Sequence, residues 1–192
     1  MSIEYIPQMF WVQIGDLEVP DKMPTFILKY TGKINIALGK PASQSTTWRN
    51  FSASRANNGN RASHFSSGSC SHTEHETTNW WQVDLQGMYS IASVFIVNRD
   101  TQITGYYGYF LQDIEVHVFQ EAPSSGLPNG TVCATHIPAM GANATLQCEA
   151  PVIGRYLRIY RRSSETVETP KLVFCEVEVY GRPVTTCGGM WG

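Results

Sequence analysis

The feature that most constrains the fold is a pair of strand-like patterns that follow each other in the first half of the chain. In residues 80–85 apolar and polar side chains alternate, as in a strand with one buried face. After a turn expected at Gln86–Gly87, residues 89–97 form a denser run of β-branched and apolar side chains, typical of a buried sandwich strand. If the strands pair, His72 and Arg99 near their ends would reach one pocket, where an imidazole and a guanidinium offer donors and acceptors to a hydroxyl-rich ligand.

Composition favours an all-β chain that binds no nucleic acid. The 192 residues suit one domain with a small appendage, and they are rich in Gly, Ser, Thr and β-branched residues with few helical signals. The net charge is −2 and Lys and Arg are scattered, so the chain lacks the basic patch that nucleic acids or anionic membranes require. No apolar run approaches the roughly 20 residues of a membrane-spanning helix.

Other segments show strand or turn patterns. Alternation is clear in residues 111–119 and 153–160, and a last strand is predicted over residues 172–180. Residues 122–130 are rich in Pro, Ser and Gly, which predicts a turn. Residues 1–33 match no pattern that we can place, and we expect the tail of a preceding domain, an extension docked on the main domain or a partly ordered leader.

The cysteines and glycosylation motifs favour an oxidising compartment. None of the five cysteines forms the Cys-x-x-Cys spacing of a zinc knuckle. Sequons begin at Asn50, Asn129 and Asn143, in turn-rich segments where a glycan is tolerated. We therefore predict a secreted glycoprotein. The first residues lack the basic start and apolar core of a signal peptide, so we expect the sequence to be a fragment or an incomplete gene model.

Several of these motifs resemble those of the F-type lectins, a family of fucose-binding lectins. The similar motifs are Ser-Cys-Ser-His at residues 69–72, Trp-Trp-Gln-Val-Asp-Leu at residues 80–85, and Asn98-Arg99. A closing motif over residues 172–180, with Cys-Glu-Val-Glu-Val inside it, looks like the last strand of the family.

The resemblance implies a fold and domain boundaries. It begins at Ile34 and continues to about Tyr180, so it covers most of the chain. It implies an all-β fold, a jelly-roll β-sandwich of the discoidin-like type, in residues 34–181. Residues 1–33 are then an N-terminal extension or linker, and residues 182–192 are a Gly-rich C-terminal tail.

The resemblance also implies a sugar site. Family members bind fucose through a histidine, an arginine and a second basic residue, and His72 and Arg99 match the first two. No basic residue occupies the third position, and the adjacent cysteine pair that stacks on the sugar in the family is absent. We expect loop aromatics to form a stacking wall instead, and Phe65 matches a residue that contacts the fucose methyl group. The predicted sugar-binding residues are His72, Arg99, Tyr106, Tyr107, Tyr109, Phe110, Phe65 and Trp48.

Structural roles stay open for three of these side chains. His72 could be a loop histidine that caps the neighbouring strand. Arg99 could form a plain salt bridge with Asp84 or Asp100. Phe65 suits the core as well as a sugar contact.

A calcium site is also implied by the resemblance. In the family a tight turn wraps a calcium ion with main-chain carbonyls and an aspartate, and Asn58 stands at the aspartate position here, keeping the oxygen without the charge. Calcium accepts 6–8 oxygen ligands, including carbonyls and amides, so a structural Ca²⁺ is expected. A hydrogen-bonded turn without metal is the alternative. The predicted ligands are Arg55, Asn58, Asn60, Ser69, Cys175 and Glu176, with main-chain carbonyls supplied by Arg55, Asn60 and Cys175.

Two disulfides are expected. A Cys133–Cys148 bridge would close a hairpin and stabilise by about 3 kcal/mol on the chain-entropy model. A Cys70–Cys175 bridge would tie the first third of the chain to the last strand, and its longer loop predicts about 4–5 kcal/mol. Cys187 is then unpaired within the chain and available to another chain or domain.

The sequence gives little support to a zinc site or an enzyme. A zinc site could be formed by the histidines and glutamates that lie close together in one polar segment. No residue elsewhere in the sequence is a clear further ligand for it. No nucleophile elbow, phosphate loop or His-Glu-x-x-His motif is present, so an enzyme is not predicted. The residues of the zinc alternative are His64, His72, His75, Glu74 and Glu76.

Lipid binding is a further alternative, because the Trp-x-Val-Asp-Leu element recurs in discoidin-like lipid-binding domains. It would need exposed apolar side chains above basic ones. Trp48 and Phe51, with Arg49 and Arg55, could supply these. As loop aromatics, Trp48 and Phe51 could equally contact a ligand or clamp the edge of the domain.

The sequence therefore predicts a secreted, calcium-stabilised lectin that recognises fucosylated or related glycans on cells or glycoproteins through His72 and Arg99. The alternative is a degenerate lectin fold that acts as a protein-interaction module without binding sugar. Lectin avidity usually needs several sites, so an oligomer or a multidomain chain is expected.

Overall fold

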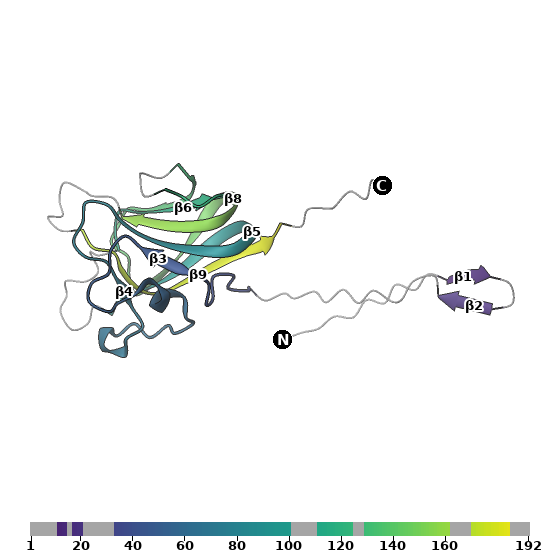
Figure 1. Ribbon diagram of the computed structural model, residues 1–192, viewed down its shortest axis with the longest axis horizontal. Helices are drawn as coiled ribbons and strands as arrows, with labels where there is room; N and C mark the ends of the chain where they lie inside the picture. Colours follow the sequence, from purple (N-terminus) through teal and green to yellow (C-terminus); the bar gives the residue numbers. More distant parts are fainter. Residues whose placement is uncertain are drawn as a thin grey trace. The chain divides into compact units, whose positions relative to one another are not determined.

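The computed structural model describes most of the chain and divides it into two compact units, Met1–Ile34 and Asn35–Gly192 (Figure 1). In the first unit, β1 (Trp11–Ile14) pairs antiparallel with β2 (Leu17–Pro20). The described residues are 11–14, 17–20, 33–100, 111–124, 129–161 and 170–184.

The second unit is an antiparallel β-structure in which only 3-10 helices interrupt the strands of the described residues. The order of the hydrogen-bonded strands is β4–β9–β5–β8–β6–β7, and β3 pairs with β5. The all-β prediction is confirmed. The elements are β3 (Ala42–Gln44), η1 (Ala53–Asn57), η2 (Phe65–Ser67), β4 (Ser71–His72), β5 (Asn79–Asn98), β6 (Ile114–Phe119), β7 (Thr131–His136), β8 (Asn143–Arg161) and β9 (Val173–Pro183).

The long strand β5 corrects the predicted turn at Gln86–Gly87. Gln86 does adopt a left-handed conformation, with φ at 60°, and its N–H donates to Asp84 Oδ1 at 2.8 Å. The register with β8 shifts between Asp84 and Tyr89. This is the signature of a bulge, which bends a strand without reversing it. The two predicted strands are therefore one strand, and they do not pair with each other.

Strands β5 and β8 each take part in both layers of a sandwich (Figure 1). The first half of β5 pairs with β3 and with the second half of β8, which continues to β6 and β7. The second half of β5 lies between β9 and the first half of β8. Side chains from both halves of β5 belong to one buried cluster, so the layers pack face to face and the predicted sandwich is confirmed. These side chains include Trp81, Val83, Leu85, Val94 and Ile96.

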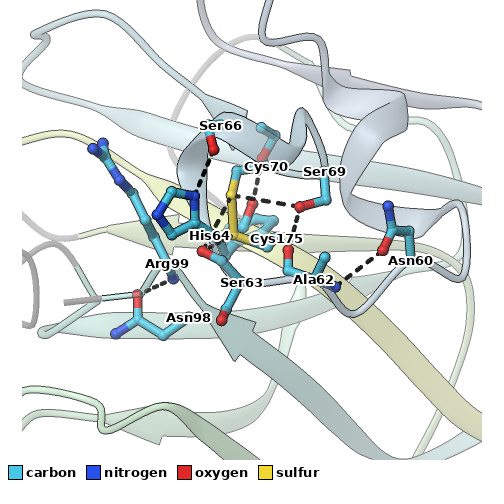
Figure 2. The surroundings of a disulfide bond; sticks show 12 residues. Asn60, Ala62, Ser63, His64, Ser66, Ser69, Cys70, Asn98, Arg99 and Cys175 are labelled. Carbon is cyan, nitrogen blue, oxygen red and sulfur yellow. Dashed lines mark hydrogen bonds between the residues drawn. A yellow bond between two sulfur atoms is a disulfide. The ribbon is translucent and has the colours of Figure 1, made fainter. Parts of the chain in front are cut away.

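Both predicted disulfides are present. Cys133 of β7 is bonded to Cys148 of β8, which joins the edge strand of one layer to the other layer. Cys70, directly before β4, is bonded to Cys175 of β9, and both are fully buried (Figure 2). Cys187 lies outside the described residues.

Candidate functional site

His72 is a buried, neutral imidazole at the end of β4, which pairs with the start of β9. Only 4% of its surface is exposed, and Nδ1 lies 2.6 Å from the Thr73 carbonyl oxygen. Since a carbonyl only accepts, Nδ1 is the donor, and the neutral ring keeps an acceptor lone pair on Nε2. Burial lowers the pKa of His72 to about 4 against the opposing effect of that hydrogen bond, and the charges of Lys171, Arg99 and His75 add to the lowering.

Arg99 leaves the end of β5 in a position set by Asn98. The buried Asn98 side chain donates from Nδ2 to the carbonyls of Met140 at 3.0 Å and Gly141 at 3.2 Å, and its Oδ1 accepts the N–H of Arg99 at 2.8 Å. Figure 2 shows this last bond beside the disulfide. The Arg99 guanidinium carbon lies 3.6 Å from the ring centroid of Phe65, as in a close cation–π contact.

Three aromatic rings gather around His72. The Phe51 and Phe65 rings stack at 4.5 Å, and Trp48 lies 5.3 Å from Phe51 and 6.0 Å from Phe65, between ring centroids. Trp48 also lies 4.7 Å from the His72 ring, while Phe65 meets the imidazole edge-on at 6.3 Å. These rings are half-buried. The structure therefore brings together four of the predicted residues, His72, Arg99, Phe65 and Trp48, and adds Phe51.

Hydrogen bonds from Gln44 and the backbone hold the aromatic loop against His72. Gln44 Nε2 donates to the carbonyls of Phe51 at 3.0 Å and His72 at 3.2 Å, and to Thr47 Oγ1 at 2.9 Å. The Trp48 N–H donates to the His72 carbonyl at 2.9 Å, and the His72 N–H to the Phe51 carbonyl at 3.1 Å. The role of Gln44 was missed from sequence, since it depends on contacts between distant segments.

The structure rules out an Arg99–Asp84 salt bridge and places Phe65 outside the core. Asp84 is paired with Arg155, through hydrogen bonds of 2.7 and 2.8 Å, so it is not the partner of Arg99. Phe65 and Trp48 lie outside the buried core cluster and pack on the rings beside His72.

The predicted aromatic wall of Tyr106, Tyr107, Tyr109 and Phe110 lies outside the described residues. Hollows of about 500 and 590 Å³ occur elsewhere, beside β6 and between β7 and β8, and neither touches His72.

Glu176 lies fully buried on β9 next to the turn that resembles a calcium loop. Its Oε1 accepts the N–H of Gly59 at 3.0 Å, while Oε2 is buried and has no hydrogen-bond partner among the described residues. Burial raises the pKa of Glu176 to about 7. An unpartnered buried carboxylate oxygen is costly, and a cation beside it would remove that cost.

Other predicted calcium ligands lie in or before the same turn, or beside the disulfide bond whose Cys175 precedes Glu176. Asn58 Oδ1 accepts the N–H of Asn60 at 2.8 Å, which shapes the turn around Gly59. Ser69 precedes the Cys70–Cys175 disulfide, and its hydroxyl donates to the carbonyl of Ala62 (Figure 2). The carbonyl of Arg55 belongs to η1, directly before the turn. Carboxylate, amide, hydroxyl and carbonyl oxygens form the donor set that calcium prefers, so these residues fit the ion.

No group of three or more His, Cys, Asp or Glu side chains converges as a metal site within the part of the chain that the structure describes. The zinc alternative at His64, His72 and His75 therefore has no supporting geometry, and His72 Nδ1 is already occupied by a carbonyl.

Comparisons with known proteins find sugar-binding relatives of this chain. Residues 55–159 match the family model described as "NedA-like, galactose-binding domain". The chain is 37% identical to a fucolectin of Anguilla anguilla over 76% of this chain and 89% of the eel protein. Its fold is similar to that of an f-lectin from striped bass serum (Morone saxatilis), with a TM-score of 0.70 and 33% identity over 82% of this chain and 52% of that one.

A bacterial structure is also similar. A fucose binding module from Streptococcus pneumoniae shares 30% identity and a TM-score of 0.63, covering 79% of this chain and 97% of the module. The resemblance read from the motifs at residues 69–72, 80–85 and 98–99 is thus confirmed. The chain belongs to the fucolectin, or F-type lectin, family.

Proposed function

We propose that this domain is a lectin that binds fucosylated glycans between His72, Arg99 and the aromatic rings beside them. The observation that carries the proposal is that His72 and Arg99 approach the same ring, Phe65. Arg99 lies over it at 3.6 Å, and the imidazole meets it edge-on at 6.3 Å. A fixed acceptor, a fixed cationic donor and an apolar face thus converge, as in sites that recognise small polar ligands.

The chemistry of these groups suits a deoxy sugar. Nε2 of the neutral His72 accepts a hydrogen bond from a sugar hydroxyl, and Arg99 donates to hydroxyl or ring oxygens. Phe65 and Trp48 offer apolar surface to C–H groups such as the methyl of fucose. The names of the relatives, a fucolectin and a fucose binding module, support the same ligand class.

The test is a glycan array probed with the full chain in the presence of Ca²⁺, alongside His72→Ala and Arg99→Ala. Arg182→Ala is the matched control, since Arg182 is exposed on β9. Fucosylated glycans bound by the wild type and the control, and lost in both site variants, support the proposal. A folded protein that binds no glycan would refute it and favour the protein-interaction alternative. Hits on other sugars would assign specificity to the loop aromatics Tyr106, Tyr107, Tyr109 and Phe110.

We further propose a structural Ca²⁺ held by the turn of Asn58 and Asn60 together with Ser69, Arg55, Cys175 and Glu176. Bound there, the ion would neutralise the buried Glu176 and fix the turn. The unpartnered Oε2 of Glu176 and the all-oxygen donor set support this assignment.

We also propose that the protein acts outside the cell as a binding protein without catalysis. The disulfides and the three sequons support an oxidising compartment. The described residues contain no helix of the length and apolarity needed to cross a bilayer. Lipid insertion is not favoured, because Trp48 and Phe51 pack on each other and are half-buried.

A further inference from the structure

Two arginines stack on the aromatic rings beside His72. The guanidinium carbon of Arg49 lies 4.3 Å from the ring centroid of Trp48, and that of Arg55 lies 4.8 Å from the ring centroid of Phe51. Trp48 and Phe51 stack on each other beside His72, so both cations belong to the rim of the same aromatic cluster.

Neither cation is neutralised by a carboxylate of the described residues. Arg61 and Arg155 each form an ion pair, whereas Arg49 and Arg55 form none within the part of the chain that the structure describes. Arg49 is exposed and Arg55 is half-exposed. The chain carries a net charge of −2, so a local positive charge from two guanidinium groups is opposite in sign to the charge of the chain as a whole.

The backbone holds Arg49 at a cost. Its φ is 52°, in the left-handed region that residues other than Gly, Asn and Asp rarely adopt. The conformation is fixed on either side, since the Trp48 N–H donates to the His72 carbonyl and the Phe51 N–H donates to the Trp48 carbonyl at 3.1 Å. Backbone strain of this kind is held where the surrounding structure requires it, and it clusters at ligand sites.

We propose that Arg49 and Arg55 form a second subsite that binds an anionic group on the glycan, next to the sugar held by His72 and Arg99. The ligand class is a fucosylated oligosaccharide that carries a sulfate ester or a carboxylate on a neighbouring sugar. This inference rests on the proposed function. A planar guanidinium donates two parallel hydrogen bonds to either anion, and stacking on an aromatic ring orients the plane in advance.

The magnitude follows from exposure. Charge-assisted contacts at the surface are individually weak, so each arginine is expected to contribute a few-fold, and the pair about tenfold, in low salt. Because exposed charges are screened by ions, the preference is expected to shrink in high salt, where the Debye length falls to about 3 Å at 1 M.

The test compares affinities of the full chain for three immobilised probes. They are a neutral fucosylated trisaccharide, the same trisaccharide with a sulfate on its galactose, and the same core with a terminal sialic acid. The proteins are the wild type, Arg49→Gln, Arg55→Gln and the double variant. The control is Arg182→Gln. Arg182 lies nine residues beyond Val173 on β9, and nine residues of a strand span roughly 30 Å.

We expect a charged probe to bind about tenfold more tightly than the neutral one in 50 mM salt, each single substitution to reduce this ratio, and the double variant to bring it to about one. A ratio kept in the control and lost in high salt supports the subsite. The probe with the larger ratio identifies sulfate or carboxylate as the anion. A wild-type ratio of one, or a ratio that the double variant keeps, overturns the inference while leaving the lectin intact. Failure of all three probes to bind overturns both proposals.

Discussion

The low pKa of His72 predicts that folding stability falls in acid in a defined window. In the unfolded chain the imidazole has a pKa of about 6.5, whereas burial lowers the folded value to about 4. The unfolded state therefore takes up a proton first. The contribution of a neutral His72 is fully present above pH 6.5 and is lost as the pH falls through about 4.

The size of the loss follows from the two pKa values. Relative to neutral pH, the titration of His72 lowers the free energy of unfolding by about 0.8 kcal/mol at pH 6 and by about 2 kcal/mol at pH 5. The variant His72→Asn isolates this effect, because an asparagine amide can still donate to the Thr73 carbonyl but does not titrate. Urea unfolding of both proteins at pH 7.5, 6 and 5, in EDTA, gives the two stability profiles.

The difference between the profiles of wild type and His72→Asn is the quantity to examine. Glu176, with its pKa raised to about 7, also titrates in this pH range, and its protonation stabilises the folded state as the pH falls. This contribution is present in both proteins, so it cancels in the difference. We expect the wild type to lose about 2 kcal/mol more than the variant between pH 7.5 and 5. Parallel profiles would show that His72 titrates as an exposed histidine does, and the geometry of a neutral, buried acceptor would be wrong.

Three further predictions concern stability. With Ca²⁺ at a hundredfold its Kd, wild type should gain about 2.7 kcal/mol over EDTA by thermal unfolding, while Glu176→Gln should show no calcium response; an equal response in the variant would exclude the proposed site. Gly154→Ala should cost about 1–3 kcal/mol in urea, because the new Cβ would lie 2.6 Å from the Phe119 carbonyl oxygen, and Gly141→Ala, with open space around it, should change little. Replacing both Cys133 and Cys148 by alanine should lower the free energy of unfolding by about 3 kcal/mol. A loss near zero would contradict the chain-entropy account.

Much of the fold was accessible from sequence because strand alternation and burial coincide. The apolar positions of residues 80–85 do face the core, and the pattern of residues 172–180 does mark the last strand, β9. The error at Gln86–Gly87 has a local cause. A left-handed residue before a glycine serves a hairpin turn or a bulge equally well, and only the pairing of β5 with β8 decides between them.

The site was accessible in part. Motifs located His72 and Arg99, but their surroundings depend on contacts that no local pattern encodes. Phe51 joins the site because Gln44 binds its carbonyl and that of His72, which lie in separate segments. The altered pKa values of His72 and Glu176 likewise arise from burial, which only the packed sandwich creates.

Because β5 and β8 run through both layers, neither layer can come apart while the other persists. Each strand pairs with neighbours in both layers, so a break in one strand removes partners from both. We therefore expect local opening at the loops and edge strands, and the slowest exchange of backbone amides with solvent along β5. The residues proposed to bind sugar at its margin thus stand on strands that are held by protein contacts alone.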